Sequence, residues 1–250
     1  MIDNNKLEKL YEIINESHDI VFFGGAGIST ASGIPDFRGA NGLYNYTPEE
    51  IISHSFFVSN TKEFYEFYLS KMVYKEAKPN ECHKALKLLE DKHKLLSIVT
   101  QNIDGLHQDA GSKKVYELHG SIMRNYCMKC GKFYTLEELE KSIVDGVPRC
   151  SCGGKIKPDV VLYEEPLDDY VVASAINDIR RCDTLIIAGT SLVVYPAAGF
   201  IRYFRGKNIV VINLGETNYN AFVGMNTDLL VIDGKVEEYL NCENVKKFVK

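Results

Sequence analysis

The sequence predicts an α/β protein with a Rossmann-type parallel sheet covered by helices on both faces, together with a small domain made of a zinc ribbon and a helical insertion. Three observations support this prediction. Short apolar runs alternate with amphipathic helical stretches along most of the chain. The first of these runs stops abruptly at two glycines. Two segments, one rich in aromatic residues and one rich in cysteines, interrupt the alternation.

The large domain is expected to begin with a helix and a buried strand. Residues 7–14 carry apolar side chains at helical spacing, and residues 20–23 form a β-rich run that ends at Gly24-Gly25. Further strands are expected at 95–99, 185–188, 209–212 and 229–232, and helices at 82–90 and 171–179. Strands that are apolar on both faces and alternate with helices are typical of a parallel sheet that is covered on both sides.

The two interrupting segments are expected to pack together as a small domain. Residues 40–78 are aromatic-rich and helical in pattern, and residues 123–155 carry paired cysteines and several glycines. The predicted boundaries are therefore 1–39, 79–122 and 156–250 for the large domain, and 40–78 and 123–155 for the small one.

Composition narrows the class of protein. The chain has 250 residues, of which 45% are hydrophobic, so it can bury a full core. It has neither an apolar run of membrane-spanning length nor a secretory leader pattern, and we expect a cytoplasmic location with no membrane partner. A net charge of −5 argues against nucleic-acid binding, which needs a surplus of Lys and Arg. A basic protein tail is a more natural partner.

Four of the seven cysteines predict a structural zinc site. Cys127 and Cys130 form one close pair, and Cys150 and Cys152 form another. Four thiolates from two turns complete a tetrahedral shell around Zn²⁺ and leave no position for a substrate. The other three cysteines are interpreted as small core residues.

Polar motifs follow three of the expected strands. The turn at residues 24–30 could hold a pyrophosphate or could be a tight connection, and by itself the pattern leaves both open. Residues 100–107 place two amides and a carboxylate at a strand end, where ligands of open α/β sheets bind; the alternative is a capped helix start. His119 follows the short run at 115–118 and could act as a general base, although a single histidine is more often structural.

In order along the chain, these motifs resemble those of the sirtuin family. The family patterns G-A-G-x-S, G-I-P-D-F-R, T-Q-N-I-D-x-L-H, H-G, the paired cysteines, P-x-x-V, G-T-S-L and I-N are matched at 25–29, 33–38, 100–107, 119–120, 127–152, 158–161, 189–192 and 212–213. The match covers nearly the whole chain from residue 20 to 235. The residues within the motifs are most similar to those of a bacterial branch of the family.

The resemblance implies roles for individual residues around NAD. By the family's pattern, the NAD site is lined by Ala26, Thr30, Phe37, Arg38, Gln101 and His119. The nicotinamide end is surrounded by Asn102, Ile103 and Asp104, and the adenosine end is held by Thr190, Ser191 and Asn213, with Asp233 near the last strand as an addition.

The resemblance also implies the reaction, which is NAD-dependent removal of acetyl groups from protein lysines. The acyl oxygen attacks the nicotinamide ribose, nicotinamide leaves, and His119 takes a proton from a ribose hydroxyl. The products are lysine, nicotinamide and 2'-O-acetyl-ADP-ribose. Asn102 would position the ribose and a water, and Phe37 would shield the reactive centre. NAD is a consumed co-substrate, and Zn²⁺ is structural.

An acetylated protein or peptide is the expected partner. The resemblance implies that it enters as an extra strand between Val160, Val161, Leu162 and Tyr163 on one side and the loop after residues 189–193 on the other. Many relatives have F-G-E at the end of this segment, where this chain has Tyr163-Glu164-Glu165. Glu164 leads us to expect a preference for basic residues beside the acetylated lysine.

The acyl group is expected to be neutral. The family branch that removes succinyl groups has Tyr-x-x-Arg over the acyl channel, whereas this chain has Tyr65 and Tyr68 at the matching positions. Without the cation an acidic acyl group would enter unpaired, so we expect acetyl and longer neutral groups as substrates and poor desuccinylation.

Three other functions are compatible with parts of the sequence. A zinc-ribbon binding module would use the cysteines alone, and an NAD-dependent dehydrogenase would share the fold but reuse its cofactor. Protein ADP-ribosyl transfer would share the motifs. Nicotinamide release that depends on an acetylated peptide separates deacetylation from all three.

Overall fold

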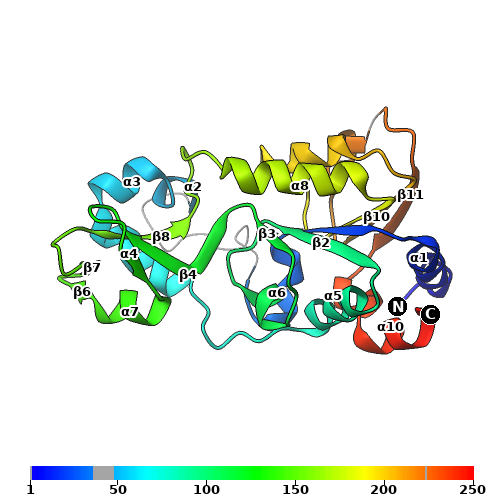
Figure 1. The fold of residues 1–250 in the computed structure, drawn as a ribbon, viewed down its shortest axis with the longest axis horizontal. Coiled ribbons are helices and arrows are strands. Elements are labelled where there is room, and N and C mark those ends of the chain that lie inside the picture. The colour runs from blue at the N-terminus through cyan, green and yellow to red at the C-terminus, as the bar shows by residue number, and fades with distance from the viewer. Residues whose placement is uncertain (1, 36–47, 223) are drawn as a thin grey trace.

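The fold is built on a six-stranded parallel sheet, as expected (Figure 1). The computed structural model describes residues 2–35, 48–222 and 224–250. The strand order is β11-β10-β9-β1-β2-β3, and every neighbouring pair is parallel. The strands are β1 (Ile20–Gly24), β2 (Leu95–Thr100), β3 (Val115–Glu117), β9 (Thr184–Ala188), β10 (Asn208–Asn213) and β11 (Asp228–Asp233).

Both faces of this sheet are covered, because successive strand residues point to opposite sides. Ile20 and Phe22 enter one apolar cluster, and Val21 and Phe23 enter the other. Figure 1 shows α8 along one face, and α5 and α10 on the other. The face that contains Ile20 and Phe22 is covered by α1 (Asn4–Glu16), α5 (Glu81–Asp91), α9 (Val236–Tyr239) and α10 (Cys242–Phe248). The opposite face is covered by α8 (Asp169–Arg181) and the 3-10 helix η4 (Ala197–Tyr203). The strands and helices expected in the large domain are thus confirmed.

A second module lies beyond the β3 edge. It contains an antiparallel sheet of order β5-β4-β8 and the hairpin β6-β7. Its elements are α2 (Pro48–Ile51), α3 (His54–Ser59), α4 (Thr61–Lys71), β4 (Gly120–Cys127), β5 (Phe133–Tyr134), α7 (Leu136–Lys141), β6 (Ile143–Val144), β7 (Val147–Pro148) and β8 (Ile156–Val160). One apolar cluster joins residues from α2–α4 to residues from β4 and β8, so the two interrupting segments do pack together. The residue boundaries between the domains stay a prediction.

The join between β3 and the second sheet is narrow and tightly specified. Gly120 has a φ of +73°, and a Cβ built on it would lie 1.7 Å from the carbonyl oxygen of Asp159. The Arg124 guanidinium donates to Glu117 on β3 and to Asp159 on β8, with both distances 2.7 Å. A glycine and a bridging cation therefore fix the second sheet to the end of β3.

No helix within the described ranges is long and apolar enough to cross a membrane.

Two buried histidines pack between α5 and α6 (Leu106–Asp109). The rings of His83 and His107 have centroids 4.7 Å apart. Within the described part of the chain, neither nitrogen of His107 has a hydrogen-bond partner, and Nε2 of His83 has none. Burial lowers the pKa of His83 to about 4, and burial, with a smaller effect from His83, lowers the pKa of His107 well below its usual value. Both rings are therefore neutral at pH 7.

We expect this pair to make folding sensitive to mild acid. Below a pH of about 6.5 the unfolded chain binds protons on both imidazoles while the folded chain does not, so the free energy of unfolding falls as the pH falls. The loss should be about 2 kcal/mol for His83 between pH 6.5 and pH 5. Urea unfolding at both pH values measures it. His83→Leu should flatten the dependence and the exposed His18→Gln should not; parallel losses in wild type and His83→Leu would contradict the prediction.

Candidate active site

Two glycine turns meet at the carboxyl edge of the sheet. The turn after β1 runs through the 3-10 helix η1 (Ala26–Ile28), and its Gly27 amide donates to the carbonyl of Gly189, which follows β9 (2.9 Å). A Cβ on Gly27 would lie 2.7 Å from the Cα of Gly189. A Cβ on Gly25 would lie 2.8 Å from the Cβ of Thr190. Glycine is required here because the two backbones approach closely.

A polar cluster lies beside these turns, where the segment after β2 meets the segment after β1. The Ser29 hydroxyl donates to Oδ2 of Asp104 (2.6 Å) and accepts from the Asn102 side-chain amide (3.1 Å). Asp104 also accepts from the Leu106 amide (2.9 Å) at the start of α6. Burial raises the pKa of Asp104, although the Ser29 hydrogen bond opposes the shift. The turn expected at Asp104 before a helix is therefore present, and the ligand role of residues 100–107 stays a prediction.

The imidazole of His119 is hydrogen-bonded to the backbone at the same edge of the sheet. Its Nδ1 lies 2.9 Å from the carbonyl oxygen of Gln101. A carbonyl only accepts, so the proton of the neutral ring sits on Nδ1, and Nε2 carries the free lone pair. Burial lowers the pKa of His119, with the Gln101 carbonyl opposing the shift, so the ring is neutral at pH 7. The Gln101 side chain donates to Thr190 (3.3 Å) and links this group to the second glycine turn.

A hollow of about 770 Å³ opens along the same edge toward β10 and β11. Four residues expected at the NAD site line it: Thr30, Thr190, Ser191 and Asn213. Sequence reasoning missed its other polar walls, which are formed by Glu216, Thr217, Asn218, Lys235 and Glu237. The side-chain amide of Asn213, which the motifs did identify, donates to the Thr217 hydroxyl (3.0 Å). Asn213 therefore holds one of these unpredicted wall residues in place.

The other predicted NAD residues within the described ranges do not line this hollow. Ala26, Gln101, Asn102, Ile103, Asp104 and His119 lie on the turns beside it, after β1, β2 and β3. Asp233, at the end of β11, accepts from the Gly215 amide (3.3 Å) and holds the turn after β10. Phe37 and Arg38 lie outside the described residues.

The segment expected to pair with the peptide belongs to a strand only at its first residue. β8 ends at Val160, and Tyr163 forms only an isolated bridge with Ser53. The backbone amides of 161, 162 and 163 are bound by the His119 carbonyl, the Glu165 carboxylate and the Ile52 carbonyl. These contacts bend the chain out of strand geometry and leave the Tyr163 side chain exposed.

Glu164 adopts a backbone conformation that favours glycine, with a φ of +76°. Its carboxylate accepts from the amide of Ser55 (2.8 Å) and from the hydroxyl of Ser55 (2.9 Å) at the start of α3. The side chain remains exposed. The Glu164 carboxylate therefore lies at the end of the expected peptide path, where it is hydrogen-bonded to the start of α3.

Tyr65 and Tyr68 are completely buried in the core of the second module. The Tyr65 hydroxyl donates to the carbonyl of Ile156. The Tyr68 hydroxyl has no partner among the described residues, and its ring stacks on Phe64 at a centroid distance of 5.7 Å. Burial raises the pKa of both tyrosines.

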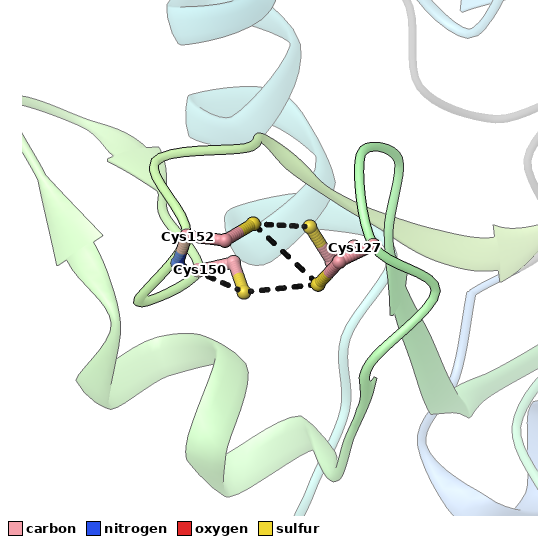
Figure 2. Close-up of side chains that lie close together, drawn as sticks. Cys127, Cys150 and Cys152 are labelled. Carbon is pink, nitrogen blue, oxygen red and sulfur yellow. Dashed lines mark hydrogen bonds between the residues drawn. The ribbon is translucent and has the colours of Figure 1, made fainter.

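The four paired cysteines converge at the far end of the second module, where Figure 2 shows Cys127, Cys150 and Cys152 facing one another. All four sulfur atoms lie within 4.8 Å of one another, and three of the separations are 3.4–3.6 Å. A zinc ion with Zn–S bonds of about 2.3 Å would hold its sulfurs about 3.8 Å apart, so the set fits a tetrahedral thiolate site. A hydrogen bond from the Cys152 amide is the main cause that lowers the pKa of Cys150 to about 5, which favours the thiolate.

Comparison with known proteins agrees with this arrangement. A family model described as "Sir2 family" matches residues 25–196. A Clostridium perfringens (strain 13 / Type A) protein named NAD-dependent protein deacetylase is 58% identical, and the match covers 93% of this chain and 97% of the relative. This chain belongs to the Sir2 family. A Clostridium acetobutylicum relative of the same name is 55% identical, with 94% and 97% covered.

Solved Sir2 structures have the same fold as this sirtuin. A Sir2 bound to an acetylated peptide matches with a TM-score of 0.83 and 38% identity, covering 96% of this chain and 97% of that one. A Sir2 complex with a p53 peptide and NAD matches with a TM-score of 0.82 and 38% identity over the same shares. The Rossmann-type fold with a zinc-ribbon module is therefore confirmed.

The zinc site gives this sirtuin a testable dependence on metal. We expect one Zn²⁺ per chain, and we expect Cys150→Ser to lose the metal and to lower the free energy of unfolding by more than about 3 kcal/mol, because ligand geometry and folding of the ribbon are coupled. Elemental analysis and denaturant unfolding with and without chelator measure both effects. Cys242→Ser, outside the cluster, is the control; retention of metal by Cys150→Ser would contradict a four-cysteine site.

Proposed function

We propose that this sirtuin is an NAD-dependent protein-lysine deacetylase that transfers acetyl from acetyl-lysine to ADP-ribose and releases nicotinamide and 2'-O-acetyl-ADP-ribose. The observation that carries the proposal is a pair of hydrogen bonds made by Gln101. Its carbonyl binds the neutral imidazole of His119, and its side chain binds Thr190 on the turn that borders the hollow. The names of the Clostridium relatives support the reaction class.

NAD would lie along the carboxyl edge. The hollow lined by Thr30, Ser191 and Asn213 has a volume suited to a nucleotide and would hold the adenosine end. The cradle formed by the glycine turns excludes any Cβ and would take the pyrophosphate. Asn102 and Asp104, held in place by Ser29, would face the nicotinamide end.

When bound, NAD supplies an electrophilic ribose carbon and a nicotinamide leaving group. His119 would accept a proton from a ribose hydroxyl at Nε2, because Nδ1 already carries the proton bound to Gln101. Asn102 would position the ribose and a water through an amide whose orientation is set by Ser29. Phe37 and Arg38 are proposed to complete the site on the basis of the motif alone.

The acetylated peptide would pair with the segment Val160, Val161, Leu162 and Tyr163. The Val161 carbonyl and the Glu164 amide have no intramolecular partner among the described residues and are free to bind a strand. Val193, exposed after the second glycine turn, would form the opposite side of the entry. Tyr65 and Tyr68 would form the inner end of the channel for the acyl group, because they belong to the same core cluster as Val160.

The experiment that tests the proposed reaction is nicotinamide release from NAD with and without an acetyl-lysine peptide. We expect release to require the peptide and to fall by a factor of about 10² to 10⁴ in His119→Ala. Because burial depresses the pKa of His119 and the base must be neutral, the rate should decline only at a pH below about 6.5.

His18→Ala, at an exposed site, is the matched control and should retain the wild-type rate. Release that proceeds equally well without the peptide would replace deacetylation by hydrolysis or ADP-ribosyl transfer.

Acyl selectivity provides a second test. We expect kcat/KM for a succinyl-lysine peptide to be at least about a hundredfold below that for the acetyl peptide, since a carboxylate beside Tyr68 would be buried without a cation. Paired assays on one peptide sequence measure the ratio. Tyr68→Phe should keep the preference, because the hydroxyl supplies no charge. Comparable rates for the two acyl groups would show that a cation reaches this site.

A further inference from the structure

A second hollow, of about 880 Å³, lies far from the proposed reaction. It is bordered by residues that precede β10 and β11, at the amino ends of the strands, whereas the glycine turns lie at the carboxyl ends. Its walls come from the two crossovers that join β9 to β10 and β10 to β11. Nothing in the proposed deacetylation uses it.

The charge of this hollow is positive and uncompensated. Arg202 and Arg205 line it, and no aspartate or glutamate is among the described residues of its wall. Neither arginine forms an ion pair with any residue that the structure describes. Two guanidinium groups in one concave surface repel each other unless an anion lies between them.

The guanidinium of Arg205 is held in place before any ligand arrives. Its Nη1 donates to the carbonyl oxygens of Arg202 and Phe204, each at 2.7 Å. Arginine has five N–H groups in a rigid plane, so the others remain free to bind an anion. The Arg202 side chain makes no hydrogen bond within the described residues, and it can move toward the same ligand.

Neutral donors complete the wall. Asn220, Asn226 and Thr227 line the hollow and present amide and hydroxyl groups, while Phe204 and Met225 contribute apolar surface. Arginine binds the oxygens of phosphate in bidentate geometry, and amides and hydroxyls bind the oxygens that remain.

We propose that this hollow is a binding site for a small phosphate-bearing anion, with Arg202 and Arg205 as its cationic ligands. The site is separate from the NAD site, because the two hollows share no lining residue.

The proposal is tested by calorimetric titration of inorganic phosphate and of pyrophosphate into the full chain saturated with NAD, at constant ionic strength. NAD occupies the glycine turns, which would otherwise bind the same probes, and constant salt removes general screening effects. We expect one saturable site per chain, at least about tenfold weaker in Arg202→Gln and in Arg205→Gln, with Arg181→Gln as an exposed control that binds like wild type.

Arg202→Gln is the deciding variant, since it removes no hydrogen bond or ion pair within the described protein and should leave deacetylation unchanged. Absence of binding in the wild type, or equal affinity in Arg202→Gln, would overturn the proposal. Tighter binding of citrate than of pyrophosphate would overturn the phosphate class. If the proposed NAD site were wrong, the wild type would show a second phosphate site at the glycine turns, and Arg202→Gln would weaken the first site and keep the second, which distinguishes the two failures.

Discussion

The contact between the turns after β1 and β9 is the constraint on which the rest of the site depends. Gly27 and Gly189 meet backbone to backbone, at a distance that leaves no room for a side chain on either residue. Because β9, β1 and β2 are neighbours in the sheet, this contact also places Thr190 within reach of Gln101. Segments far apart in sequence therefore form one polar edge, and sheet order creates the site.

One connection between the second module and this edge runs directly through His119. His119 ends the segment after β3, and the next residue, Gly120, begins β4, whose far end carries Cys127. Arg124 bridges β3 and β8 across the join. The zinc site and the imidazole thus stand at opposite ends of one strand, so that loss of metal can disturb the proposed base without any direct contact between them.

Most of the fold and the zinc site could be predicted because their signals are local. Apolar strand runs and paired cysteines are visible in short windows, and each was confirmed. Glu216, Thr217 and Lys235 were missed because they lie on the irregular segments after β10 and β11, where neither periodicity nor a motif marks a residue that lines a hollow. Residues 161–163 leave strand geometry because their amides are bound by His119, by the neighbouring Glu165 and by Ile52, and the contacts from Ile52 and His119 come from distant parts of the sequence.

Glu164 shows how one such distant contact changes the meaning of a substitution. A left-handed backbone at a residue other than glycine costs about 1 to 3 kcal/mol. Two charge-assisted hydrogen bonds from Ser55 oppose that cost, so the glycine conformation survives with a carboxylate in place. Both Ser55 donors are neutral groups, and the negative charge is therefore not cancelled. The carboxylate that we expect to favour basic residues of a peptide is therefore also the group that holds the start of α3, so a substitution of Glu164 would change both properties together.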